Sequence, residues 1–438
     1  MTLALKLSKY TSQSFWLILE KIFRLGLSLI GNSIVIRYLG AKDFGILSYS
    51  TSIVFLFSAF SNLGLELVVI RRIVENESST PLIIGVSIIL KLIASCICVL
   101  LVIILSGFNL FGEVNSTIVI LVSLFLIFQS FNAVEYKYQA TLKSRMISVS
   151  KTISFTFFTI LRLLFVYLKL DLIWFGVLIS VEYFLYIISY HYVNKVNAFK
   201  PEYKIDLALT KSMLQESWPL IFSGVVSFLY IRVDQLMITN LLGAEENGIY
   251  SAAARLSEAW YIIPNMIIAA VYPAIVKLKS SRSNQSLIDS FQALYSFFAL
   301  LSVFASVVVL FLSDHIITVL YGKEFMESSL VLSIQIWSGI FIFFRVLSGK
   351  WLVSEGYQKK SLERSIVGLV VNVILNLFLI KKYGIIGAAV ASLISFAVVG
   401  LVYDLINKVT RVHFVLKIKS IIYMFRIKRI LKILKKLS

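Results

Sequence analysis

The stretch "LGAKDFGILSYS" at residues 39–50 is repeated, with changes, as "LGAEENGIYSAA" at residues 242–253. The copies are 203 residues apart, and six positions of the first are identical in the second: Leu39, Gly40, Ala41, Gly45, Ile46 and Ser48. Asn62 falls on Asn265 in the same register. Since the same short loop recurs at one offset, we expect two halves of similar structure.

The composition is that of a membrane protein. Hydrophobic residues make up 59% of the chain and charged residues 15%, with a mean hydropathy of +0.89, whereas soluble domains are roughly 45–50% apolar. The apolar residues form runs near the ~20 residues that a membrane-spanning helix needs. They do not alternate as barrel strands do, which predicts an all-α polytopic fold. We expect twelve spans: 15–36, 45–69, 82–106, 115–134, 152–169, 172–192, 215–240, 249–273, 291–312, 328–348, 362–380 and 384–405.

Basic residues are distributed unevenly over the loops. Only six of the 42 Lys and Arg residues lie on loops after odd-numbered spans, whereas the termini and the even-numbered loops hold most of the others. The positive-inside rule then places both termini in the cytoplasm. It also accounts for most of the net charge of +19, so no nucleic acid is predicted as a partner.

The spans divide the chain into four predicted regions. They are an N-terminal six-helix lobe at 1–194, a cytoplasmic linker at 195–213, a C-terminal six-helix lobe at 214–410 and a tail at 411–438. The tail carries nine Lys and Arg and no acid. Its apolar residues recur at helical spacing, so we expect it to lie along an anionic leaflet of membrane lipids. Docking of a partner protein is the alternative.

The repeat has a mechanical consequence. Six spans separate the two copies, so both halves have the same orientation, related by an axis along the membrane normal. Two such lobes leave a cavity between them, and rocking one against the other gives alternating access. Gly40 and Gly243 suit the tight turns that such short loops demand.

Several motifs resemble one family. The segments "RLGLSLIGNSIVIRYLGAKDFGILSYS" (24–50) and "NLGLELVVIRR" (62–72) look like the start of Wzx-type flippases of the multidrug/oligosaccharidyl-lipid/polysaccharide (MOP) exporter superfamily. The segments "RVDQLMITNLLGAEENGIYSAAARLSEAW" (232–260) and "YGIIGAAVAS" (383–392) are similar to later spans of that family. The resemblance implies transfer of an O-antigen or capsule unit across the bacterial inner membrane. It also implies a polysaccharide polymerase and a chain-length regulator as partners.

Charged residues inside the spans need a reason, because each costs roughly 2.5–3.5 kcal/mol at the bilayer centre. In the first span, Lys21 and Arg24 share a helical face with Ser28 and Gly31. In the seventh, Asp234 shares a face with Ser223, Ser227 and Tyr230; in the eighth, Arg255, Glu258 and Asn265 share one. We expect these faces to line the cavity.

Cationic side chains in a cavity suit pyrophosphate, because the planar fork of arginine matches phosphate oxygens. We predict that Arg24 and Arg255, supported by Lys21, hold the pyrophosphate of the ligand that the resemblance implies, an oligosaccharide on undecaprenyl pyrophosphate. The other polar or coupling candidates are Glu20, Asp234, Glu258, Asn62 and Asn265. The alternative is that Glu20 with Arg24, and Arg255 with Glu258, are ion pairs that only hold the bundle together.

No cofactor or metal site is predicted, and the absence of a nucleotide-binding motif argues against direct ATP hydrolysis. The membrane potential or a coupled H⁺ or Na⁺ remains as the energy source. Two other functions are open. A multidrug exporter of the same superfamily is less favoured, since the spans hold more basic than acidic residues. A polysaccharide polymerase is disfavoured because the predicted external loops are too short for its catalytic site.

Overall fold

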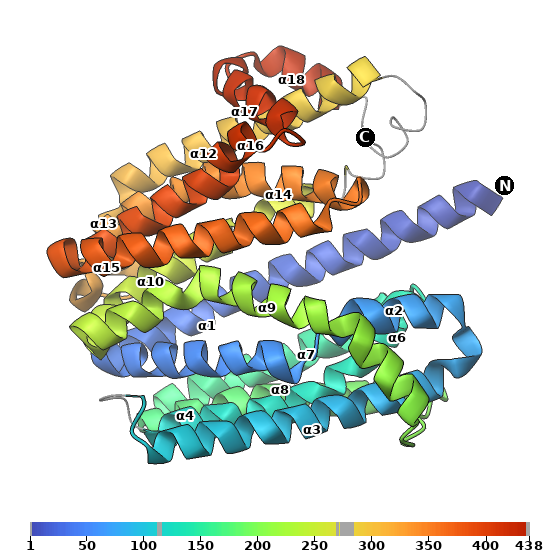
Figure 1. Ribbon diagram of the computed structural model, residues 1–438. Helices are drawn as coiled ribbons and strands as arrows, with labels where there is room; N and C mark the ends of the chain where they lie inside the picture. The colour runs from blue at the N-terminus through green and yellow to red at the C-terminus, as the bar shows by residue number, and fades with distance from the viewer. Residues whose placement is uncertain (1, 112–115, 269–270, 272–283, 435–438) are drawn as a thin grey trace. The chain divides into compact units, whose positions relative to one another are not determined.

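The computed structural model describes residues 2–111, 116–268, 271 and 284–434. Side chains are described from residue 22 onward within these ranges, apart from residues 284, 429, 431, 432 and 434. Every regular element in this part of the chain is a helix (Figure 1), which confirms the all-α prediction. The chain forms two compact units, Met1–Gly248 and Ile249–Ser438.

The first unit holds the helices of the N-terminal half and the first helix after it. They are α1 (Thr2–Ser61), α2 (Leu65–Glu75), η1 (Glu77–Ser79), α3 (Thr80–Gly107), α4 (Ser116–Ser123), α5 (Phe125–Gln129), η2 (Ser130–Asn132), α6 (Ala133–Ala140), α7 (Ser144–Tyr167), α8 (Leu172–Val196) and α9 (Leu207–Leu242). Helix α1 contacts α7 and α9, and α7 contacts α8. The boundary between the units falls inside α10 (Ala244–Trp260).

The second unit holds the remaining helices. They are α12 (Asn284–Leu320), η3 (Lys323–Phe325), α13 (Ser328–Gln335), α14 (Ser338–Ser354), α15 (Gln358–Ala397), a π-helical turn η4 (Val398–Val402), α16 (Tyr403–Ile406), α17 (Arg411–Tyr423) and α18 (Ile427–Leu434). The division into lobes at 1–194 and 214–410 remains a prediction.

Three helices break or end at single glycines. Helix α1 breaks at Gly40, with φ 72° and ψ 176°, and α9 ends at Gly243, with φ 104° and ψ 174°. These two glycines are 203 residues apart and have nearly the same backbone conformation, one that residues with a Cβ rarely adopt. The turns predicted from the repeat are therefore confirmed. Helix α15 breaks in the same way at Gly384, with φ 59°.

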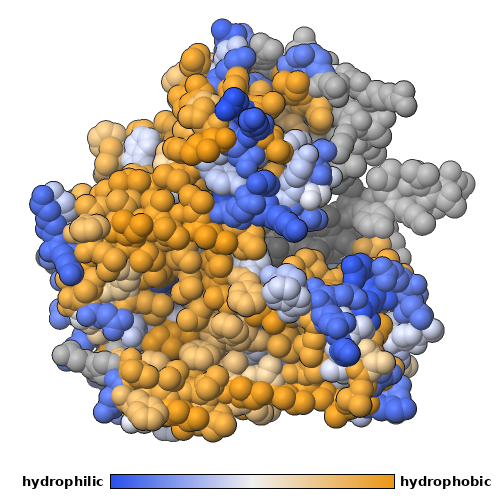
Figure 2. Space-filling view, viewed as in Figure 1, coloured by the Kyte–Doolittle hydropathy of each residue, from blue (hydrophilic) through white to orange (hydrophobic). Residues whose placement is uncertain are grey.

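Within the described residues, nine helical segments are long and apolar enough to cross a membrane. Two of them, Ile22–Glu75 with 54 residues and Gln358–Ile406 with 49 residues, are long enough for two of the predicted spans each. The predicted span at 249–273 begins in α10 and runs into residues outside the description, so the count of twelve is consistent with these segments. Figure 2 shows hydrophobic side chains over most of α3 and hydrophilic ones around α2 and α6. The protein is a multi-pass membrane protein.

The predicted linker at 195–213 lies inside the first unit. The backbone N–H of Glu202 donates to the carbonyl of Pro81 at 2.9 Å. A Cβ added to Gly85 on α3 would lie 1.8 Å from the carbonyl oxygen of Glu202, so only glycine allows this approach. Lys137 places its ammonium 3.4 Å from the ring centre of Phe199. These contacts fix the linker to the ends of α3 and α6.

Helix α17 packs into the second unit through a mostly polar buried face made of His413, Lys417 and Ser420 together with Leu416. The ammonium of Lys417 bonds the carboxylate of Asp404, the carbonyl of Gly400 at 2.7 Å and the hydroxyl of Ser348 at 3.2 Å. Gly400 lies in the π-helical turn η4, where regular i→i+4 bonding is interrupted. Burial lowers the pKa of Lys417 to about 8, against the opposing effect of Asp404.

His413 fixes the same helix to α12. Its Nδ1 lies 2.9 Å from the hydroxyl of Tyr295, and its ring centre is 4.4 Å from that of Trp351. Burial lowers the pKa of His413 to about 3, so the imidazole is neutral near neutral pH. Ile422 is exposed on the opposite side of α17, and this is the side that could make the membrane contact that the sequence predicts for the tail.

The buried charges around Asp404 predict an order of stabilities. Two cations share this carboxylate, Lys417 in direct contact and Arg364 with an N–O distance of 3.9 Å. Asp404→Asn leaves both cations buried without a counter-charge, which costs roughly 3–5 kcal/mol. Lys417→Met leaves Asp404 with Arg364 and should cost less. We expect melting temperatures of the purified protein in the order wild type, Lys417→Met, Asp404→Asn.

The matched control for this prediction is Lys419→Met, because Lys419 is exposed on the same helix. Its melting temperature should equal that of the wild type. An Asp404→Asn protein as stable as Lys417→Met would show that Arg364 does not depend on this carboxylate.

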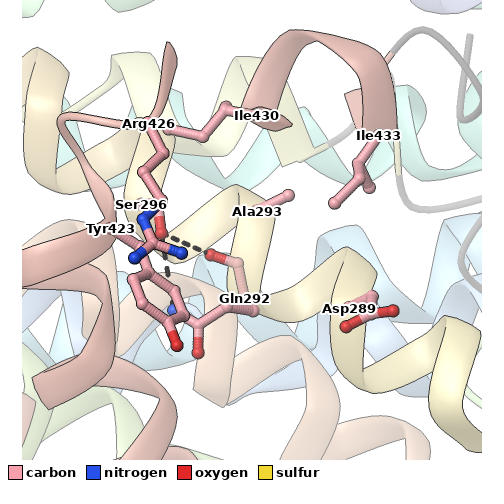
Figure 3. Close-up of a pocket in the computed structure, with 8 residues that line it drawn as sticks. All are labelled: Asp289, Gln292, Ala293, Ser296, Tyr423, Arg426, Ile430 and Ile433. Carbon is pink, nitrogen blue, oxygen red and sulfur yellow. Dashed lines mark hydrogen bonds between the residues drawn. The ribbon is translucent and has the colours of Figure 1, made fainter. Parts of the chain in front are cut away.

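A small pocket lies between α12 and the C-terminal helices (Figure 3). Asp289, Gln292, Ala293 and Ser296 of α12 line one side, and Tyr423, Arg426, Ile430 and Ile433 line the other. Gln292 also accounts for part of the packing of α17, since its amide donates to the carbonyl of Leu416 at 3.0 Å. The pocket is thus a feature of how the tail is attached.

Candidate functional site

Arg24 is a half-buried cation on α1 with defined partners in the first unit. Its Nη2 donates to the hydroxyl of Tyr186 on α8 at 2.9 Å, and that hydroxyl donates to Glu182 at 2.8 Å. The guanidinium carbon lies 4.8 Å from the ring centre of Phe155 on α7. A cation held over an aromatic face by a hydroxyl keeps a fixed orientation. Arg24 is therefore a positioned charge inside an apolar helix.

The rest of the predicted polar face of the first span packs against α7. A Cβ on Gly31 would lie 3.0 Å from the Thr159 side chain, so a larger residue would push the helices apart. Next to it, Asn32 accepts from Nη1 of Arg162 at 2.5 Å and donates to Ser28 at 2.9 Å. This face therefore joins α1 to α7 and α8 as well as carrying Arg24.

A second charged group lies beside the first. Lys151 on α7 forms an ion pair with Glu135 on α6 at 2.9 Å, and the hydroxyl of Tyr190 donates to the same carboxylate at 3.3 Å. The ammonium of Lys151 is 5.4 Å from the ring centre of Tyr186. We call Arg24, Tyr186, Glu182, Lys151, Glu135 and Tyr190 the N-terminal polar network.

The other predicted residues of this unit have mixed surroundings. The side chains of Glu20 and Lys21 lie outside the described residues, so their roles stay predictions. Asn62 is half-buried where α1 ends, and its amide donates to the carbonyl of Ser58 at 2.8 Å and to Gln129 at 3.3 Å. Asp234 on α9 is buried, with 5% of its surface exposed, and Arg232 is half-buried.

Arg255, Glu258 and Asn265 belong to the second unit. Arg255 and Glu258 are half-buried on α10, and Asn265 is exposed. Asn62 and Asn265 therefore share the repeat register but differ in burial. Since Arg24 and Arg255 lie in different units, their joint action on one ligand remains a prediction.

The two copies of the repeated loop are packed against each other. A Cβ on Gly45 would lie 1.7 Å from the carbonyl oxygen of Ala244, and one on Gly248 would lie 1.8 Å from that of Ala41. The contact is reciprocal, because each pair maps onto the other at the 203-residue offset. Each copy supplies Ala-x-x-x-Gly, the small-residue spacing that lets membrane helices touch through their backbones.

Side-chain hydrogen bonds surround this contact. The amide of Asn247, which is fully buried, donates to the carbonyl of Gly45 at 3.1 Å. About two turns further along α1, the hydroxyl of Ser52 donates to Gln235 of α9 at 2.7 Å. Residues 41–52 and 235–248 thus form a closely packed contact within the first unit.

Nearer the N-terminus of α9, an ion cluster joins this helix to α2. Nη2 of Arg71 and Nη2 of Arg72 each bond one carboxylate oxygen of Glu216. A Cβ on Gly64, between α1 and α2, would lie 2.7 Å from Cβ of Leu220. Exposed ion pairs contribute about 0–1 kcal/mol each. The close backbone approach at Gly64 therefore matters more for this contact than the charges do.

Sequence reasoning missed the partners that position Arg24. Glu182, Tyr186 and Tyr190 recur every four residues on α8 and form one stripe, which is the signal that could have marked this helix. The buried trio of Arg364, Asp404 and Lys417 was also missed. Lys417 stands in a tail whose many basic residues look alike in sequence.

Two family models match the chain. Residues 11–279, more than half of the chain, match the family described as polysaccharide biosynthesis protein, and residues 219–378 match the family described as MatE. The capsular polysaccharide biosynthesis protein CapF of Staphylococcus aureus is 26% identical over 294 residues, which are 65% of this chain and 72% of that protein. The probable low-salt glycan biosynthesis flippase Agl15 of Haloferax volcanii is 26% identical over 52% of this chain and 45% of its own length.

The fold has solved counterparts. The lipid II flippase MurJ, in an inward closed conformation, superimposes with a TM-score of 0.52 at 17% identity, over 95% of this chain and 92% of that one. At this identity the likeness shows the fold alone. The chain belongs to the polysaccharide biosynthesis protein family, and its fold is that of the MOP superfamily.

Proposed function

We propose that the protein moves an oligosaccharide linked to undecaprenyl pyrophosphate from the inner to the outer leaflet of the bacterial cytoplasmic membrane. The observation that carries this proposal is Arg24, a cation oriented by Tyr186 and Phe155 within an apolar helix. A pyrophosphate is the part of such a ligand that an oriented guanidinium recognises best, through paired N–H donors. Membership of a polysaccharide biosynthesis family supports a glycan as the remainder.

In this proposal Arg24 and Arg255 bind the pyrophosphate, with Lys21 adding charge. The sugars occupy the predicted cavity, and the lipid tail stays in the bilayer. Glu20, Asp234, Glu258, Asn62 and Asn265 are the polar groups available to the sugars or to a coupling ion. A polymerase and a chain-length regulator then use the translocated unit.

Transport proceeds by alternating access. In this proposal both termini lie in the cytoplasm and the repeated loops lie on the outer side, where the contact of Gly45 with Ala244, inside the first unit, opens during the cycle. Opening it releases the ligand outward. An inside-negative potential favours this movement of negative charge by about 2.3 kcal/mol per charge per 100 mV.

Deletion of the gene from a strain whose surface glycan requires it tests this function. We expect the surface glycan to be lost while completed lipid-linked units accumulate on the inner leaflet. Leaflet location is measured by the accessibility of the sugars to an impermeant labelling reagent in intact cells and in inverted vesicles. Units that reach the outer leaflet but are not polymerised would contradict the proposal and point to a polymerase.

A multidrug exporter is the second candidate, because residues 219–378 match the MatE family. The same deletion strain separates the two functions. An exporter predicts greater sensitivity to cationic drugs with a normal surface glycan. If the protein is a flippase, the surface glycan should be lost. Drug sensitivity should then be unchanged in strains that tolerate the loss of the glycan.

A further inference from the structure

Helix α17 turns an apolar side outward and a mostly polar side toward the rest of the second unit. Val415, Ile418 and Ile422 follow one another at steps of three and four residues, so they form one stripe along the helix. All three are exposed, and Phe425, in the turn after the helix, exposes 74% of its surface. The opposite side carries Lys417, which is fully buried. This is the reverse of a helix at a water-facing surface, which buries its apolar stripe.

The stripe continues an apolar surface at the end of the last predicted span. Leu405 and Ile406, at the end of α16, expose 45% and 74% of their surface. Helix α17 begins shortly after them at Arg411, whose Nε donates to the carbonyl of Leu405 at 3.3 Å. This hydrogen bond holds the start of α17 beside the end of a membrane span. The outer side of α17 therefore lies where the hydrocarbon layer meets the lipid headgroups.

The charged side chains exposed around the stripe are basic. Among the described residues that follow Asp404 they are Lys408, Arg411, Lys419, Arg426 and Lys428. The sequence from residue 405 to residue 438 contains no Asp or Glu, and Asp404 is buried against Lys417. Asp289 of α12 lines the pocket beside Arg426 and offsets one of these charges. An apolar stripe accompanied by cations is the pattern of a helix that lies in an anionic membrane surface.

The second unit already holds α17 in place. Lys417 bonds the carboxylate of Asp404, and the amide of Gln292 donates to the carbonyl of Leu416 at 3.0 Å. A surface fixed in this way loses little conformational entropy when it binds a ligand. The same packing removes Lys417 from the cations that can reach a lipid, although its neighbours in sequence resemble those of Lys419.

We propose that the outer side of α17 binds anionic phospholipids, such as phosphatidylglycerol, in preference to zwitterionic ones. We call this surface the lipid-binding face; its residues are Arg411, Val415, Ile418, Lys419, Ile422, Phe425 and Arg426. The apolar residues enter the boundary of the acyl chains, and the cations bind the headgroup phosphates. The inference goes beyond the proposed function and does not rest on it, because it requires no step of ligand transfer.

The test measures which lipid lies next to the face. The full-length protein, with Cys96 and Cys98 replaced by serine, carries a fluorophore on Ile422→Cys. It is reconstituted into mixed vesicles in which either the phosphatidylglycerol or the phosphatidylcholine has brominated acyl chains. Since bromine quenches a fluorophore that it contacts, the two quenching efficiencies give the local preference between the lipids. We expect a preference for phosphatidylglycerol of at least about fivefold, the effect of one cation near an anionic surface.

Lys419→Gln combined with Arg426→Gln should reduce this preference to near one. The matched control is Lys381→Gln combined with Lys382→Gln, which removes two exposed cations elsewhere on the second unit. The control should keep the preference of the unsubstituted protein. If the labelled protein does not assemble, the fluorophore is placed on Phe425→Cys instead.

Each contrary outcome overturns a stated part of the proposal. Equal quenching by the two lipids, or a preference that survives the loss of Lys419 and Arg426, overturns the binding of anionic lipid at this face. A preference lost to the same extent in the control shows a general effect of charge and also overturns it. Absence of quenching by either lipid excludes membrane contact and leaves the face to a partner protein. Since none of these readouts depends on transport, a failure here is distinct from a failure of the proposed function.

Discussion

Transport by Gly45→Ala and Gly248→Ala proteins is expected to fall roughly a hundredfold below that of the wild type. Each added Cβ would lie within 2 Å of a backbone carbonyl oxygen, of Ala244 or of Ala41, so the two loops must separate. Overpacking of this kind costs about 3 kcal/mol, and the closed contact loses population by the corresponding factor. The measurement is the initial rate of ligand transfer in vesicles.

Gly107→Ala is the control for these variants, because nothing lies within 4 Å of a Cβ at Gly107. It should transport normally. Occupancy of the contact is measured separately with Ser52→Cys and Gln235→Cys, whose native side chains are 2.7 Å apart, in a protein with Cys96 and Cys98 replaced by serine. A short bifunctional thiol reagent should bridge them efficiently, and less so when Gly45→Ala is added. Full transport by Gly45→Ala would show that the cycle does not need this contact.

Arg24→Ala should reduce transfer of the lipid-linked ligand about ten- to hundredfold, since each hydrogen bond to a charged group contributes about 1.5–3 kcal/mol. Arg24→Lys should lie in between, because lysine keeps the charge but lacks the planar fork. Tyr186→Phe removes only the hydroxyl that orients the guanidinium, and its effect should be smaller than that of Arg24→Ala. Initial rates in vesicles, at equal amounts of folded protein, give these values.

The control for Arg24 is Arg37→Ala, an exposed arginine on the same helix, which should transport at the wild-type rate. An Arg24→Ala protein with full activity would remove Arg24 from the ligand site. Its hydrogen bond to Tyr186 and its contact with the Phe155 ring would then only stabilise the helix bundle. This is also what the alternative of a structural ion pair between Glu20 and Arg24 proposes.

Much of the fold was predictable because it depends on local properties of the sequence. Apolar length sets the spans, and the repeat identified Gly40 and Gly243 as equivalent turns, which their matching dihedral angles confirm. Helical periodicity also showed which face of the first span is polar.

Periodicity does not show which helix a face will meet. Arg24 finds its partner 162 residues away on α8, and no pattern within the first span points there. The burial of Lys417 was likewise hidden, because its meaning depends on Asp404 and on a π-helical turn that frees the carbonyl of Gly400. The reciprocal contact of the repeat loops needed the structure as well, although the Ala-x-x-x-Gly spacing in both copies was available as a signal.

The central claim, transfer of a lipid-linked oligosaccharide between leaflets, is tested most directly with the purified protein alone. It is reconstituted into vesicles that carry a radiolabelled undecaprenyl-pyrophosphate-linked oligosaccharide, and the fraction of sugar open to an impermeant glycosidase is followed in time. Wild-type protein should expose the inner-leaflet ligand rapidly, and Arg24→Ala protein should expose it at least about tenfold more slowly. The central claim would be contradicted if folded wild-type protein, under an imposed potential and pH gradient, exposed the ligand no faster than protein-free vesicles do.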